Sequence, residues 1–368
     1  MQLVYFPYIN LVNKDELDFG NIKIWNFDKK SKDYIPDETL RNHVEKIIST
    51  NITKNNQKIK DIGIVSFSNV DFKELTADQH ALINELRLVL FLGFLSGRNV
   101  VLNGVNAGHF VATSENFISV IQNFDVNNEY ISEDSGLLVR KLDGGYKISE
   151  FKSIAPPYVS FPLSFYIDEI LIRRLLKMRK RSKRTYDLIL RSAETLFQAY
   201  YNDPFVSINA RILLIASAFE ILMQSPLNKA RETFKALIAS QCNLVGEKEY
   251  NFKSPRNATK SEIEKGTVKV IWAEKFFLLR NRIIHGDKVP NTQYTFKNTQ
   301  HHLMISTMFY VFLIKYKIAK VIKTKIDTFQ QSIIWGTRKE GGESVRGFFY
   351  EDNSKFTEYF RTKRSKKK

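Results

Sequence analysis

Hydrophobic and polar positions follow different periods in the two parts of this chain. In the first 150 residues, short runs of β-branched and aromatic residues predict strands, and two longer stretches predict helices. The predicted strands cover residues 3–11, 22–27 and 62–67, and the predicted helices begin at Pro36 and Gln79. Further strand-like runs lie at 99–102, 110–112 and 136–142. This pattern predicts a mixed α/β domain over residues 1–155.

After the prolines of residues 155–162, where the chain cannot remain helical, the pattern changes to the period of helices. Helices are predicted from Phe165 onward, over 185–201, 210–224, 226–242, 271–286 and 293–323, with a polar, loop-like segment at 243–264. The predicted fold class is therefore an α+β chain of two domains. An all-α helical bundle would occupy residues 163–325, followed at 326–368 by an aromatic, glycine-containing segment and a basic tail.

The stretch 272–286 combines an apolar stripe with a polar side. On a helical wheel that advances about 100° per residue, the stripe consists of Trp272, Phe276, Leu279 and Ile283. Arg280, Asn281 and His285 lie on the opposite side. Arg280 and His285 are separated by roughly 140°, so they converge only if the helix ends at Gly286 or if a second copy of the helix faces the first. The polar side is therefore predicted to meet something other than the core.

The motif Arg280-Asn281-x-x-x-His285-Gly286, which follows an aromatic-rich helical run, resembles the R-x4-6-H motif of HEPN domains. The helix at 210–223, with Glu220 inside an apolar stretch, resembles the matching helix of the Apea-like HEPN subgroup. With the helix after Pro290, the resemblance spans about residues 185–325. It implies an all-α domain that often dimerises. In many members it also implies a metal-independent endoribonuclease in toxin, abortive-infection or antiviral roles, whereas some members only bind RNA.

The Glu220 carboxylate is predicted to pair with a cation, because burying a carboxylate without one costs free energy. Arg280 and Arg282 are the candidates. Two interpretations remain open: an ion pair that only orients the arginine, or a carboxylate that tunes the basicity of His285.

RNA carries its own nucleophile, the 2′-hydroxyl, so an enzyme needs only to move protons and to hold charge. The hypothesis is that His285 is the general acid/base, that Arg280 stabilises the transition state and that Asn281 positions the phosphate or the helix end. Glu220 and Arg282 would support them, and two copies in a homodimer would supply one acid and one base. A structural interpretation also exists, because His and Arg near a helix C-terminus are stabilised by the helix dipole.

The net charge of +17 is distributed unevenly. Residues 1–150 carry 16 Lys and Arg against 20 Asp and Glu, whereas residues 151–368 carry 40 against 19. Eight cations are concentrated in a segment that we call the basic strip: Arg173, Arg174, Lys177, Arg179, Lys180, Arg181, Lys183 and Arg184. Such asymmetry predicts a polyanion partner, with RNA favoured, although a solvated surface that only aids solubility is the plainer explanation.

Other features narrow the class of protein. The single cysteine, Cys242, excludes an internal disulfide and fits a reducing compartment. The longest apolar run, 88–95, is too short to span a bilayer, and no signal peptide is evident, so a cytoplasmic protein without membrane contact is predicted. His301 and His302 point about 100° apart on a helix and lack an acidic neighbour, so neither a metal nor another cofactor is predicted.

The sequence therefore predicts a metal-independent endoribonuclease of toxin or antiphage type that acts on RNA. The alternative is a non-catalytic HEPN module that binds RNA or a partner protein. A nuclease restrained by an antitoxin or by its own first half is a third possibility. For residues 1–155, a role as a sensor or substrate selector and a purely structural role both remain open.

Overall fold

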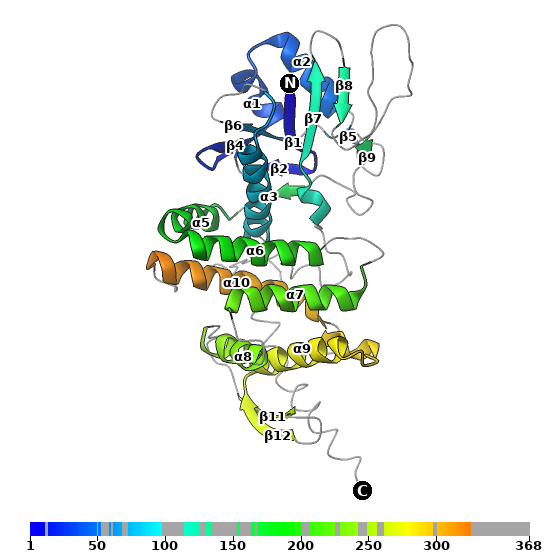
Figure 1. The fold of residues 1–368 in the computed structure, drawn as a ribbon, viewed down its shortest axis with the longest axis vertical. Helices are drawn as coiled ribbons and strands as arrows, with labels where there is room; N and C mark the ends of the chain where they lie inside the picture. Colours follow the sequence, from blue (N-terminus) through cyan, green and yellow to red (C-terminus); the bar gives the residue numbers. More distant parts are fainter. Residues whose placement is uncertain are drawn as a thin grey trace, which may run out of the picture. The chain divides into compact units, whose positions relative to one another are not determined.

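The computed structural model describes residues 1–11, 14–49, 51–52, 59, 62–67, 73–97, 114–125, 130–133, 153–154, 163–165, 168–200, 206–224, 229–241, 249–255, 261–296 and 300–324 (Figure 1). The chain forms two compact units. The first comprises Met1–Arg98, Phe110–Leu176 and Tyr200–Val206, and the second comprises Asn99–His109, Lys177–Ala199 and Ser207–Lys368. The predictions for strands at 99–102, 110–112 and 136–142, for the 155–162 linker and for the 326–368 segment fall outside the described residues.

The first unit is built on a six-stranded antiparallel sheet with the order β3-β4-β6-β1-β7-β8. Its strands are β1 (Gln2–Phe6), β3 (Glu16–Asp18), β4 (Ile22–Asn26), β6 (Gly63–Phe67), β7 (Val120–Asp125) and β8 (Tyr130–Glu133). Val4 of β1 pairs with Val65 on one side and with Ile121 on the other, so the first strand of the chain is central. Two short parallel pairs join β2 (Ile9–Leu11) to β10 (Leu163–Phe165) and β5 (Asn51–Ile52) to β9 (Ser153–Ile154).

Helices α1 (Phe27–Tyr34), α2 (Glu38–Ile48) and α3 (Ala77–Gly97) and the 3-10 turn η2 (Ser114–Phe117) complete this unit. The sequence predicts a helix that begins at Pro36, and α2 begins at Glu38, where the Asp37 carboxylate caps it by accepting a hydrogen bond of 2.7 Å from the Leu40 N–H. Buried Trp25 stacks on Tyr34 at 4.7 Å between ring centroids. The mixed α/β first half predicted from the sequence is confirmed.

The second unit is mostly helical. Its helices are α6 (Lys183–Ala199), α7 (Ile208–Met223), α8 (Ala230–Gln241), α9 (Val268–Ile284) and α10 (His302–Ile322), and the division between the units falls within α5 (Glu169–Arg181). Helix α7 packs against α6, α9 and α10, and α8 packs against α9. The side chains of Phe219, Phe234, Phe276 and Tyr310 are fully buried there, so the aromatic residues of the second half form one core. The predicted α+β class is confirmed.

Two hairpins interrupt the helices of this unit. Strands β11 (Tyr250–Pro255) and β12 (Ser261–Gly266) pair within the segment that the sequence predicts as a loop. The short pair β13 (Thr295–Phe296) and β14 (Gln300–His301) follows the 3-10 turn η4 (Asn291–Gln293). The prediction of one helix over 293–323 is therefore wrong in its first turns. The polar and β-branched residues before His302 lack a helical apolar period, and the His302 N–H donates to the Tyr294 carbonyl instead.

Within the residues that the structure describes, no helix combines the length and the apolar character that crossing a bilayer requires.

Candidate functional site at the end of helix α9

Helix α9 ends where the sequence predicts. Along its apolar stripe, Trp272, Phe276 and Leu279 are buried, which fixes the helix against α7 and α8. His285 is the C-cap, and Gly286 adopts a φ of 75°, the left-handed conformation that glycine tolerates best. The Gly286 N–H donates to the Ile283 carbonyl at 3.1 Å, and the Asp287 N–H donates to the Arg282 carbonyl at 2.9 Å. These two bonds define a Schellman motif.

Arg282 holds the segment that follows this helix end. Its Nε lies 3.5 Å from Asp287 Oδ2, so an ion pair occupies the place of the apolar contact that usually accompanies a Schellman motif. Its Nη1 donates to Gln293 Oε1 at 2.5 Å and its Nη2 donates to the Lys288 carbonyl at 3.2 Å. Arg282 is therefore not the partner of Glu220. It fixes the chain that follows Gly286.

Glu220 of α7 pairs with Arg280 of α9, the other candidate partner. Arg280 Nη2 lies 2.8 Å from Glu220 Oε1, and the two side chains are 24% and 17% exposed. Arg280 Nη1 also donates to Asn281 Oδ1 at 3.0 Å. Burial raises the pKa of the Glu220 carboxyl, and the charge of Arg280 opposes that rise. Helices α7 and α9 thus hold the guanidinium in place while part of it faces solvent.

His285 differs from Glu220, Arg280 and Asn281, which are partly buried, because its side chain is exposed. Its backbone N–H donates to the Asn281 carbonyl at 3.0 Å, which fixes the backbone of the C-cap. Among the described residues, the imidazole itself makes no hydrogen bond or ion pair. The structure thus connects Glu220, Arg280 and Asn281 by direct side-chain contacts, and leaves the imidazole of His285 available one helical turn further on.

The basic strip lies on α5 and the start of α6. Arg173 and Arg174 belong to the part of α5 assigned to the first unit, and the other six residues belong to the second. Several members contact the protein itself. The Arg179 guanidinium lies 5.9 Å from the Tyr186 ring centroid, Arg181 Nη1 donates to the Ile322 carbonyl at 3.0 Å, and Lys183 lies 3.8 Å from Asp187. Lys177, Lys180 and Arg184 are exposed.

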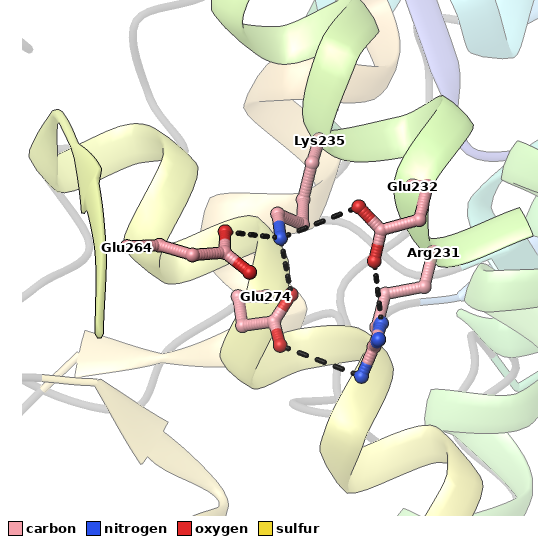
Figure 2. Close-up of polar contacts among 5 residues, drawn as sticks. All are labelled: Arg231, Glu232, Lys235, Glu264 and Glu274. Carbon is pink, nitrogen blue, oxygen red and sulfur yellow. Dashed lines mark hydrogen bonds and ion pairs between the residues drawn. The ribbon is translucent and has the colours of Figure 1, made fainter. Parts of the chain in front are cut away.

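Sequence reasoning missed a second charged cluster on α9, which we call the buried ion network (Figure 2). Lys235 of α8 is 8% exposed, and its Nζ lies 2.8 Å from Glu264 Oε2, 3.1 Å from Glu274 Oε2 and 3.4 Å from Glu232 Oε2. Glu274 is 1% exposed and also pairs with Arg231 Nη1 at 3.5 Å. Arg231 in turn lies 3.0 Å from Glu232. The network joins α8, α9 and β12.

Burial alone would lower the pKa of Lys235, but hydrogen bonds and charges from Glu264, Glu274 and Glu232 outweigh it, so the pKa is raised. The available sequence signal was a glutamate inside the aromatic run of α9, at position 274, together with the i,i+3 pair Glu232–Lys235 on α8. Such a glutamate needs a cationic partner from another element.

His302, one of the two adjacent histidines, is buried near Trp272, Phe276 and Phe296, at ring-centroid distances of 6.4, 5.9 and 6.3 Å. In the described part of the chain, no group of three or more His, Cys, Asp or Glu side chains is placed to hold a metal ion.

Comparison of the chain with models of known protein families, with curated proteins and with solved structures found no match.

Proposed function

We propose that this protein is a HEPN-type, metal-independent endoribonuclease whose site lies at the C-terminal end of α9. The observation that carries the proposal is the contrast between Arg280 and His285. Glu220 and Asn281 hold the guanidinium of Arg280 by direct contacts, whereas the imidazole of His285 is exposed and unbonded within the described residues. Cleavage by the 2′-hydroxyl requires a pre-positioned cation and an available proton carrier, and this end of α9 carries both.

In this proposal each residue has one role. His285 takes the proton of the 2′-hydroxyl or delivers a proton to the leaving 5′-oxygen, because an imidazole exchanges protons near neutral pH. Arg280 stabilises the charge on the phosphoryl oxygens. A guanidinium has five N–H donors, and the contacts with Glu220 and Asn281 use two of them. The products would be a 2′,3′-cyclic phosphate and a 5′-hydroxyl.

The partners follow from the same geometry. Each chain supplies one exposed imidazole at the end of α9, so a homodimer that brings two such ends together would provide both an acid and a base. The exposed cations Lys177, Lys180 and Arg184 of the basic strip would bind phosphates of the RNA. A toxin or antiphage role in the cytoplasm, with an antitoxin or another regulatory partner, agrees with the HEPN resemblance and with the single cysteine.

The test is cleavage of total RNA and of tRNA in the presence of EDTA, with the wild type compared with His285→Ala and Arg280→Ala. We expect each substitution to lower the cleavage rate by at least about 100-fold. His285→Ala should leave the free energy of unfolding within about 0.5 kcal/mol of the wild type, because the side chain is exposed. End-group analysis should find cyclic phosphates.

Two outcomes would contradict the proposal. Cleavage that leaves 5′-phosphate ends, or that survives His285→Ala, would show a different reaction or a different site. Tight RNA binding without any cleavage by the folded wild type, and without toxicity in cells, would favour the non-catalytic RNA-binding module. In that case binding should persist in His285→Ala.

A further inference from the structure

The β11–β12 hairpin separates its charged positions between its two faces. Successive residues of a strand point to opposite faces, and directly paired residues share a face. The register pairs Phe252 with Glu264, Asn251 with Lys265 and Lys253 with Ile263. One face therefore contains the positions of both glutamates of the two strands, Glu262 and Glu264. The other contains the positions of both lysines, Lys253 and Lys265, and no acidic residue.

The acidic face is fixed to the helices. The Glu264 carboxylate binds Lys235 of α8 at 2.8 Å (Figure 2). Phe252 is buried, and the Lys235 ammonium lies 5.9 Å from its ring centroid. At Gly266, a Cβ would lie 3.0 Å from Phe252 and 3.1 Å from Val270, so the end of β12 approaches the first turn of α9 closely. A two-stranded hairpin is marginal alone, and these contacts are what hold it in position.

The described side chains of the opposite face are exposed. The side chains of Asn251 and Lys265 are exposed, and Ile263 is 69% exposed. An exposed isoleucine between two lysine positions, on the face opposite the positions of both glutamates, presents a surface for a polyanion. The hairpin adjoins the first turn of α9, while the candidate site lies at the other end of that helix (Figure 1).

We propose that this basic face of the hairpin is a second contact surface for the RNA, remote from the cleavage site. The inference rests on the proposed function for the identity of the polyanion. Helix α9 has 17 residues, and a rise of 1.5 Å per residue separates its ends by about 26 Å. A strand with about 3.4 Å per nucleotide covers that distance with about eight nucleotides. An RNA of about sixteen nucleotides is long enough to contact the site and the hairpin together.

The test compares Lys253→Glu/Lys265→Glu with the matched control Lys32→Glu/Lys46→Glu. The control makes the same change in net charge at two exposed lysines of α1 and α2 in the first unit. All proteins carry His285→Ala to prevent cleavage. Binding of a labelled RNA of about sixteen nucleotides is followed by fluorescence anisotropy at several salt concentrations. We expect the hairpin variant to bind about tenfold more weakly at low salt, with the slope of log Kd against log salt reduced by about 1.4, the value for two lost phosphate contacts.

Each outcome decides something different. If the hairpin variant binds RNA as tightly as the control does, and the His285→Ala protein without further substitutions also binds RNA, the hairpin is not a contact surface and the proposed function is unaffected. If this His285→Ala protein binds no RNA, both the hairpin surface and the proposed function are wrong. If RNA binding depends on the hairpin but the wild type does not cleave RNA, the hairpin surface is upheld and the endoribonuclease activity is refuted. Circular dichroism and thermal unfolding of the three proteins separate a loss of contacts from a loss of fold.

Discussion

Helix α9 carries two charged clusters that differ in almost every physical respect. In its first half, Glu274 is 1% exposed and binds two cations, Lys235 and Arg231. At its end, Arg280 is 24% exposed and binds one carboxylate, Glu220, which is itself half-buried. In the first cluster, two cations lie among three carboxylates and contact them directly, whereas the second leaves donors of Arg280 available to a ligand.

This difference separates structure from function on a single helix. A buried ion network whose charged groups contact one another fixes the parts it connects. A cation that is held on one side and solvated on the other is arranged to receive an anion. The comparison predicts that substitutions in the first cluster mainly change stability, whereas substitutions in the second mainly change activity.

The largest effect is expected at Lys235. Lys235→Met removes the cation that Glu274 and Glu264 share and leaves Glu274 with Arg231 alone, at 3.5 Å, in a position too buried for water to replace the lost ammonium. We expect the free energy of unfolding to fall by about 3–5 kcal/mol, measured by urea denaturation at neutral pH. Glu232→Gln is the control, because Glu232 belongs to the same network but its side chain is largely exposed. If both variants lose the same free energy, burial does not distinguish the two clusters.

A smaller loss is expected when Arg280 is removed. Arg280→Ala leaves the Glu220 carboxylate without a cation, but this side chain retains some contact with water and its pKa is already raised by burial, so it can accept a proton. We expect a loss of about 1–2 kcal/mol by urea denaturation. Arg280→Lys keeps the charge without the planar fork and should recover part of the stability but little of the cleavage. A loss as large as that of Lys235→Met would place Arg280 with the structural cluster.

Arg282 should have a smaller effect again. Arg282→Ala removes the ion pair with Asp287 and the bonds to Gln293 and the Lys288 carbonyl, all of them at a partly exposed helix end. The Schellman bonds belong to the backbone and persist, so we expect a loss of about 1 kcal/mol. Amide hydrogen exchange should increase between residues 286 and 293 and stay unchanged in the first half of α9. Unchanged exchange in that segment would mean that Arg282 does not hold it.

The sequence predicted the elements whose signals are local. The apolar stripe of α9, its stop at Gly286 and the acidic start of α2 follow from helical period and capping, and the structure contains all three. The pairing of Glu220 with either Arg280 or Arg282 was also predictable, because a carboxylate in an apolar helix needs a cation. Which arginine binds it was not. That choice depends on where the Schellman turn directs Arg282.

The features that sequence reasoning missed depend on contacts between distant segments. The buried ion network brings together residues 231–235, 264 and 274, and no spacing rule connects them. The β11–β12 hairpin lies in a polar segment with weak alternation, and its inner face is stabilised by Lys235 of another helix. The predicted helix over 293–323 starts too early. Gln293 accepts a hydrogen bond from Arg282, and the Tyr294 carbonyl accepts one from the His302 N–H, so neither residue belongs to a first helical turn.

The smallest effect, and the one that tests the electrostatics of the candidate site, is the pH dependence contributed by Glu220. Because burial raises its pKa in the folded protein above the unfolded value of about 4.3, the folded state holds the proton more tightly. Folding stability from this group is therefore present at low pH. It is lost as the pH rises from the unfolded pKa through the raised folded pKa.

Glu220→Gln removes this titration and keeps an oxygen that can accept a hydrogen bond from Arg280. We expect the variant to become more stable relative to the wild type as the pH increases from about 4 to 7, by less than about 1 kcal/mol in urea denaturation series. The opposite sign would mean that the attraction of Arg280 outweighs burial at Glu220. The carboxylate would then be permanently ionised, and the second cluster would resemble the first more closely than their exposures suggest.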